Sequence, residues 1–251
     1  MAGSDTTEAG APAREGCDIG RRSFAGVLEQ LDPQRLMRAR AREGFLPAAG
    51  RTAVVALGKA AAGMLAGWLE AVRPEAGPRL KIILAAPADA PALPAEWAAG
   101  YGAVLTTFTA GHPIPDAASL AAGEAVLAAA QRLQDPEDLL VALISGGGSA
   151  LAEAPADGGL EAVRSLNQEL MASGAPIGDI NLIRRHRSRL KGGRLAAAAA
   201  GARQQSWILS DMPPGDWYQA ASGPTTPDGT TPAEYAAALR RWVPRFPAGG
   251  A

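Results

Sequence analysis

The sequence predicts an α/β fold, a doubly wound and mainly parallel Rossmann-like sheet with helices on both faces. Short apolar runs alternate with Ala-rich helical segments, which is typical of βαβ units. The runs are nearly continuous in apolar residues, as expected of strands covered on both faces. No repeat or linker divides residues 21–243, so we expect one α/β domain there, between a flexible tail at 1–20 and a second tail at 244–251.

Five apolar runs rich in β-branched residues are the predicted strands. Each has the length of a single buried strand, and turn residues bound it. They are residues 51–57, 80–87, 103–109, 138–145 and 206–211.

Helical segments lie before, between and after these strands. Residues 21–44 show helical periodicity in two pieces, the second of which begins with Asp32 as N-cap and a proline at the first helical position. Asp116 is expected to cap a helix that extends to about Gln134, and Thr231 opens the last helix. The remaining predicted helices are 58–72, 158–173 and 178–200, the last interrupted by "KGG".

Composition excludes several classes of protein. The chain has 251 residues, 47% of them hydrophobic, and its net charge of -1 gives no overall attraction to nucleic acid or to an anionic membrane. Cys17 is the only cysteine, so no internal disulfide can form, which fits a reducing cytoplasm. No apolar run approaches the roughly 18 residues of a membrane span, and "MAGSDTTEAGAPAREG" has no apolar signal core. We therefore expect a cytoplasmic protein with a small-molecule partner, and neither nucleic acid nor membrane as partner.

Glycine, charged and hydroxyl residues follow four of the five predicted strands. In a parallel sheet the carboxyl ends of the strands meet at one edge, and ligands bind there. The opposite ends of the strands show no such pattern. The residues that follow the strands are Gly58-Lys59, Gly111-His112, Ser145 to Ser149, and Ser210-Asp211.

The stretch "ISGGGSAL" places Gly146, Gly147 and Gly148 between Ser145 and Ser149. Backbone N–H groups left uncovered in such a turn bind anions, phosphate above all, and Ser149 can add a hydroxyl donor. The alternative is a tight strand–helix turn whose glycines only supply positive φ. Three glycines with flanking serines favour the binding function.

Lys59 stands between a strand and a helix, where a cation is unfavourable by about 0.3–1 kcal/mol. A ligand phosphate would compensate for this cost, and the alternative is a solvated surface lysine. The surroundings are not a P-loop, because Ala53 replaces the first glycine and Ala60 replaces the Ser or Thr after the lysine.

Seven basic-type residues without an intervening acid lie between residues 184 and 194, a run that repels itself and suggests an anionic ligand, although a solvated helix face is the usual explanation. Nucleic acid is an unsuitable ligand, because no aromatic residues are interleaved.

Asp211 follows a predicted strand, a position that suits a Mg²⁺ ligand or a base that accepts a proton from a hydroxyl. The alternative is a helix cap. His112, Asn181 and Ser222 are polar loop candidates.

Several motifs occur in a fixed order along residues 21 to 243, and together they resemble the N-terminal domain of the MOFRL-type (class II) glycerate 2-kinases. The motifs are "GKAAAGM" at 58–64, "GHPIPD" at 111–116, "LISGGGSAL" at 143–151, "IN" at 180–181, "R.H.S.LKGGRLA" at 184–196, "LSD" at 209–211 and "ASGPT" at 221–225.

The resemblance implies ATP-dependent phosphorylation of D-glycerate at its 2-hydroxyl, with Mg²⁺ as cofactor. Lys59 would match the active-site lysine, and Ser145–Ser149 the glycine-rich phosphate loop. Asp211 would match the carboxylate directed at metal or hydroxyl. The other residues implied are Lys191 and Gly192 for nucleotide phosphate, His112, Asn181 and His186 for substrate, and Asp216 beside Asp211 for metal.

The sequence departs from the family in three respects. We expect the C-terminal MOFRL domain to be lacking, because the chain stops shortly after "ASGPT". The segment 210–217 reads "SDMPPGDW", where the family has glycine and aspartate at the positions of Pro214 and Gly215, and Arg185, Arg187 and Arg189 are additional.

Three functions remain open from the sequence. The chain is a glycerate kinase, alone or with a second domain supplied separately, or it is a half domain that binds nucleotide or acid without turnover. A hydroxypyruvate reductase is the third, and the lack of a GxGxxG after any strand counts against it. A half-open cleft would leave an apolar patch uncovered, so we also expect self-association that depends on concentration.

Overall fold

The computed structural model describes residues 29–213 and 215–246, and a five-stranded sheet lies at its centre. All strand pairs are parallel and the spatial order is β3-β2-β1-β4-β5, which confirms the predicted doubly wound fold. β1 is the central strand, and its Leu57 lies opposite Ala85 on one side and Ile144 on the other. The strands are β1 (Thr52–Leu57), β2 (Leu80–Ala86), β3 (Leu105–Thr109), β4 (Leu139–Ser145) and β5 (Arg203–Leu209).

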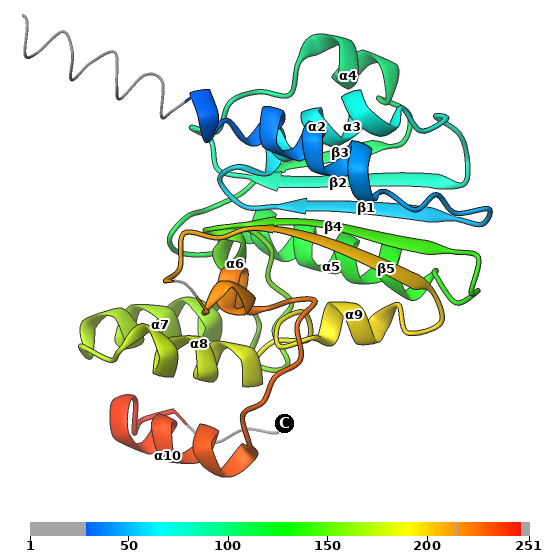
Figure 1. Cartoon of the computed structure of the whole chain (residues 1–251). Helices are drawn as coiled ribbons and strands as arrows, with labels where there is room; N and C mark the ends of the chain where they lie inside the picture. The colour runs from blue at the N-terminus through cyan, green and yellow to red at the C-terminus, as the bar shows by residue number, and fades with distance from the viewer. Residues whose placement is uncertain (1–28, 214, 247–251) are drawn as a thin grey trace, which may run out of the picture.

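One face of the sheet is covered by helices α2 (Pro33–Gly44), α3 (Ala61–Val72) and α4 (Ala95–Gly100) (Figure 1). The core between them includes Trp68, which is fully buried. The predicted start of α2 is confirmed, because the Asp32 side chain accepts a hydrogen bond from the backbone N–H of Arg35 at 3.0 Å.

The other face is covered by α5 (Ala117–Gln131), α6 (Gly148–Leu151) and α9 (Arg194–Ala198) (Figure 1). Asp116 caps α5 as predicted, in a capping box that it forms with Ser119. The small side chains of α5 allow this helix to pack closely on the sheet, since Ala122, Val126 and Ala130 are fully buried.

A further layer lies beyond α6 and is formed by α7 (Gly159–Ala172), α8 (Ile177–His186) and α10 (Pro232–Trp242) (Figure 1). It has a separate apolar cluster, in which Leu170 of α7 and Ile183 of α8 meet Tyr235 of α10. This layer places α8 beside the carboxyl edge of the sheet, where η1 (Trp217–Ser222) follows β5.

The structure differs from the predicted elements in a few places. Helix α4 and the 3-10 helix η1 were not predicted, because six residues are too few to show periodicity. β5 begins at Arg203 and not at 206, since polar residues start this half-exposed edge strand and hide it from a hydrophobicity pattern. The edge strands β3 and β5 depart most from the predicted burial on both faces, and Lys81 of β2 is also exposed.

Some predictions concern residues outside the described part of the chain. They are the tail at 1–20, the first helical piece after residue 21 and the end of the tail at 244–251. Within the described residues, no helix is long and apolar enough to cross a membrane.

Candidate active site

The candidate site lies at the carboxyl edge of the sheet, between β1 and β4. The connections from these neighbouring strands cover opposite faces of the sheet, so their first residues enclose a crevice, which is where ligands bind in such folds. Two hydrogen bonds join the two loops. The backbone N–H of Lys59 donates to the Gly146 carbonyl at 2.9 Å, and the N–H of Ala60 donates to Ser145 Oγ at 3.1 Å.

The three consecutive glycines at 146–148 allow functional side chains to approach the backbone. A Cβ on Gly146 would lie 2.9 Å from a carboxylate oxygen of Asp211. A Cβ on Gly147, whose φ is +85°, would lie 3.1 Å from the His112 ring and 3.2 Å from the Lys59 side chain. The turn therefore brings Lys59, His112 and Asp211 together from three different strand ends.

Gly148 begins α6 and is required by packing. A Cβ there would lie 2.8 Å from the Cβ of Ala221, which belongs to the "ASGPT" segment. Because α6 has only four residues, its dipole is small, and close approach of the backbone is the main property of this turn.

A cavity of about 290 Å³ opens beside the turn, between α6, α8 and η1. Its apolar wall includes Met171 and Ile177, which are 44% and 54% exposed at the surface. Its polar lining residues are His112, Ser149, Asn181, Arg184, Asp211, Gln219 and Ser222.

Three of the polar side chains form a hydrogen-bonded chain. Ser222 donates to Asn181 Oδ1 at 3.2 Å, and the Ser149 and Ser222 hydroxyls lie 3.0 Å apart. Because the one hydrogen of Ser222 is used by Asn181, Ser149 is the donor in the second bond. The chain fixes residues from α6, α8 and η1 on one wall of the cavity.

The "KGG" motif supports this wall from behind. Gly192 donates its N–H to the Ser222 carbonyl at 3.1 Å, and Gly193 donates to the Gly223 carbonyl at 2.8 Å. Ala221 and Ser222 both have positive φ, 52° and 61°, which is uncommon for residues with a side chain. The glycines therefore hold a strained segment in the conformation that directs Ser222 into the cavity.

His112 is partly buried beside the turn. Burial lowers the pKa of its imidazole, the positive charges of Lys59 and Arg184 lower it further, and Asp89 opposes the shift. At neutral pH the ring is therefore uncharged and can accept or donate a hydrogen bond to a ligand.

The structure brings together most, but not all, of the predicted site residues. His112, Gly146, Gly147, Ser149, Asn181 and Asp211 line the cavity, and Lys59 and Gly148 adjoin its turn. Ser145 is buried beneath the turn, where its hydroxyl joins β4 to the loop after β1.

Lys191, Gly192, His186 and Asp216 do not line this cavity. Lys191 is 2% exposed and forms a buried ion pair with Glu153, and its predicted contact with nucleotide phosphate stays a prediction. His186 stacks on Tyr235 at 4.8 Å between α8 and α10, and Asp216 is the residue that precedes η1.

Three polar cavity residues were not among the predicted ligand-binding residues, and one of them, Gln219, belongs to no motif of the sequence analysis. Arg184 was noted only as the first member of the basic run, and Ser222 only as a polar loop residue. Their signals were their places in the motifs "R.H.S.LKGGRLA" and "ASGPT". Neither motif shows on its own which of its residues faces a ligand.

The acidic residues present fit a magnesium ion that is shared with a substrate. Among the described residues, no group of three or more His, Cys, Asp or Glu side chains forms a complete metal cage. Mg²⁺ in phosphoryl-transfer sites uses one or two carboxylates together with substrate phosphates. The exposed Asp211 carboxylate, which lies over Gly146, can supply such a ligand.

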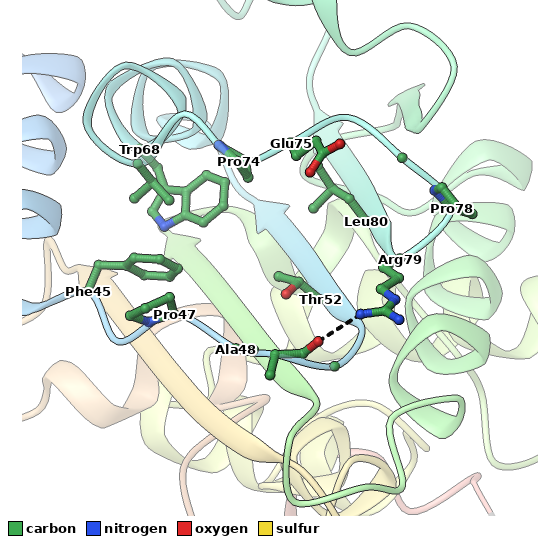
Figure 2. Close-up of a pocket in the computed structure, with 14 residues that line it drawn as sticks. Phe45, Pro47, Ala48, Thr52, Trp68, Pro74, Glu75, Pro78, Arg79 and Leu80 are labelled. Carbon is green, nitrogen blue, oxygen red and sulfur yellow. Dashed lines mark hydrogen bonds between the residues drawn. The ribbon is translucent and has the colours of Figure 1, made fainter.

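A larger cavity, of about 550 Å³, lies at the amino ends of β1 and β2 (Figure 2). Phe45 and Trp68 lie on one side of it and Pro78 and Arg79 on the other, and Arg79 already donates to the Ala49 carbonyl at 3.1 Å. Polar side chains from several strand ends do not converge there, so the smaller cavity is the candidate active site.

Solved structures of other proteins share this fold. A Pyrococcus horikoshii protein superposes with a TM-score of 0.74 at 29% identity, over 96% of this chain and 52% of that protein. The glycerate kinase of Thermotoga maritima superposes with a TM-score of 0.72 at 30% identity, over 85% of this chain and 49% of that protein. The chain thus spans about half the length of these solved proteins.

Curated relatives match over shorter segments. An Agrobacterium vitis protein that is provisionally named a hydroxypyruvate reductase is 48% identical over 134 residues. These residues are 53% of this chain and 30% of that protein. The D-glycerate 2-kinase of Thermotoga maritima is 39% identical over 125 residues, 49% of this chain and 30% of that protein. The glycerate 2-kinase of Pyrococcus horikoshii is 41% identical over 136 residues, 53% of this chain and 30% of that protein.

The expected similarity to glycerate 2-kinases is therefore supported over the matched part of the chain. A family described as a domain of unknown function, DUF4147, matches residues 20–247. Because this match extends over most of the sequence, the chain belongs to the DUF4147 family.

Proposed function

We propose that the chain transfers a phosphoryl group from ATP to the 2-hydroxyl of D-glycerate, as a glycerate 2-kinase. The observation that carries the proposal is the convergence of Lys59, His112 and Asp211 on a glycine-rich turn at the switch point of the sheet. Phosphoryl transfer requires mainly positioning and charge stabilisation, and these residues supply both. The names of the kinase relatives point to the same reaction.

Each residue has a role that follows from its place. Lys59, an exposed cation beside Gly147, neutralises charge on the transferred phosphoryl group. The glycines allow phosphate oxygens to approach the backbone without meeting a side chain. The Asp211 carboxylate orients the attacking hydroxyl and accepts its proton, and the neutral His112 ring hydrogen-bonds to the substrate.

Magnesium would be held by Asp211 and substrate phosphates, with Asp216 as the second candidate ligand, and when bound it offsets negative charge on the phosphates. Lys191 and Gly192 have indirect roles in this scheme, because Gly192 donates to the Ser222 carbonyl behind the cavity wall and Lys191 pairs with Glu153. The reaction belongs in the cytoplasm, which supplies ATP.

The exposed Met171 and Ile177 at the mouth of the cavity are expected to be covered by a further domain or by a second copy of the chain.

A product assay tests the proposal. The purified chain is incubated with Mg-ATP and D-glycerate, and 2-phosphoglycerate is resolved from 3-phosphoglycerate. We expect 2-phosphoglycerate, and Lys59→Ala should lower kcat/KM about 100- to 1,000-fold, because it removes a charge that stabilises the transition state. Lys81→Ala is the matched control, since Lys81 is exposed at the amino end of β2 and bonds only to Thr106 among the described residues.

Other outcomes contradict the proposal in different ways. A folded sample that binds ATP and forms no phosphoglycerate would be a binding half domain. Oxidation of NADH by hydroxypyruvate would favour the reductase named for the Agrobacterium vitis relative. Light scattering over a range of concentrations tests self-association, and a strictly monomeric profile would count against it.

A further inference from the structure

Arg184 is the cation that lines the active-site cavity, and it projects there from α8. Its Nε–H donates to Asn167 Oδ1 on α7 at 2.6 Å. This bond fixes the plane of the guanidinium group and leaves the four N–H groups of its two terminal nitrogens to other acceptors. Arg184 is therefore a positioned and oriented donor group.

The charge of Arg184 is not neutralised within the described residues. No carboxylate of residues 29–213 or 215–246 forms an ion pair with it, and its Asn167 partner is neutral. The neighbouring Glu153 is already paired with Lys191. Burial lowers the pKa of the guanidinium and the charge of Glu153 opposes the shift, so the site holds a desolvated cation that an anionic ligand would stabilise.

We propose that Arg184 binds the carboxylate of the hydroxy-acid substrate, with the chain of Ser149, Ser222 and Asn181 beside it. This inference rests on the proposed function for the identity of the acid. A guanidinium group presents parallel N–H donors that match the two oxygens of a carboxylate. The cavity, at about 290 Å³, is at the small end for ligand sites, which suits a three-carbon acid and not a whole nucleotide.

Lys59 and Arg184 line different cavities. Lys59 lines a neighbouring cavity of about 330 Å³ between α3 and the loop after β2, whereas Arg184 does not. Arg184 lines the cavity beside the glycine-rich turn, whereas Lys59 does not. His112 lines the cavity together with Arg184, and its ring and the Lys59 side chain both lie beside Gly147. This arrangement assigns nucleotide phosphate to Lys59 and the acid to Arg184.

Binding measurements without turnover test the assignment. Isothermal titration with D-glycerate, and separately with ATP, compares the wild-type chain with Arg184→Gln and Arg184→Lys. We expect Arg184→Gln to weaken D-glycerate binding about 10- to 100-fold, the size of a lost charge-assisted hydrogen bond, and to change ATP binding less than about twofold. Arg184→Lys should restore part of the affinity, because it keeps the charge without the planar fork.

Two further variants separate recognition from folding. Asn167→Ala keeps the charge of Arg184 but removes the hydrogen bond that orients its guanidinium group. This variant should weaken D-glycerate binding less than Arg184→Gln does. Arg189→Gln is the matched control, because Arg189 is exposed and paired with Glu124, and it should bind D-glycerate as the wild type does. Circular dichroism confirms that each variant is folded.

The outcomes separate this inference from the kinase proposal. Loss of ATP binding with retained D-glycerate binding in Arg184→Gln would assign the residue to the nucleotide and overturn the inference. Unchanged binding of both ligands would also overturn it. Acid binding that depends on Arg184, in a chain that forms no phosphoglycerate, would support the inference while the kinase proposal fails.

Discussion

The glycine-rich turn at 145–149 and the basic segment at 184–194 both contribute to the active-site cavity, but they are built differently. The turn has no charged side chain of its own, and it acts by letting Lys59, His112 and Asp211 approach its backbone. The basic segment carries many charges, and most of them are matched by acids from other parts of the chain.

Ion pairs divide the basic segment into separate structural contacts. Arg185 pairs with Asp228 at 3.1 Å and Arg187 with Asp157 at 3.1 Å. Arg189 pairs with Glu124 and Lys191 with Glu153, whereas Arg194 donates to the backbone carbonyls of Arg185 and Lys191. The comparison teaches that a dense run of charge does not by itself mark a ligand site. A half-buried cation that lines a cavity without an acidic partner, as Arg184 does, is the more informative feature.

Among the changes that test this comparison, breaking the buried pair of Lys191 and Glu153 should have the largest effect on stability. Lys191→Met leaves Glu153 as an unpaired charge that is 4% exposed, and should lower the free energy of unfolding by about 3–5 kcal/mol in urea denaturation. The double variant Lys191→Met with Glu153→Leu should recover most of this loss. A single variant as stable as the wild type would show that the pair does not hold the segment.

A methyl group in the turn should have the next largest effect. Gly148→Ala places a Cβ 2.8 Å from the Cβ of Ala221, and should lower the free energy of unfolding by about 1–3 kcal/mol. Displacement of the adjoining Ser222 should also lower kcat/KM, by up to about 100-fold. Gly178→Ala on α8 is the control, because a Cβ there meets no atom within 4 Å, and equal losses in both variants would argue against the packing explanation.

The smallest expected effect is a pH dependence of stability at His186. Burial lowers the pKa of this imidazole below its ordinary value of 6.5, Arg194 and Arg185 reinforce the shift, and Asp228 and Glu234 oppose it. As the pH falls below about 6.5 the unfolded chain therefore takes up the proton first, and stability falls, by at most about 1.4 kcal/mol per pH unit.

Urea denaturation at pH 7.5 and pH 5.5 measures this contribution. His186→Gln should show a smaller difference between the two conditions than the wild type. Equal differences would show that His186 does not titrate in this range. The lowered pKa of Asp228 contributes separately and at lower pH, because the unfolded chain takes up that proton around the ordinary aspartate value of 3.8 and the folded chain only at a lower pH.

Most of the fold and half of the site could be predicted from the sequence. The alternation of apolar strands and capped helices determines the parallel sheet, and the residues after its strands must then meet at one edge. This argument correctly brings His112, Gly146 and Asp211 together. It applies to any residue that directly follows a strand.

The remaining site residues lie on α8 and η1, and strand order does not position those elements. Their place depends on ion pairs between residues far apart in the chain, such as Arg185 with Asp228. Lys191 and Arg184 look equivalent in the sequence, yet one meets Glu153 and the other does not. Only the tertiary structure separates a buried pair from a free cation.

The exposure of Trp217 gives the chain a built-in optical reporter. This indole is 54% exposed at the start of η1, the element that ends at Ser222 in the cavity wall, whereas Trp68 is fully buried in the core. Quenching by acrylamide should therefore act more strongly on Trp217 than on Trp68. A ligand that orders η1 changes that emission, so occupancy of the cavity can be followed by fluorescence without a label.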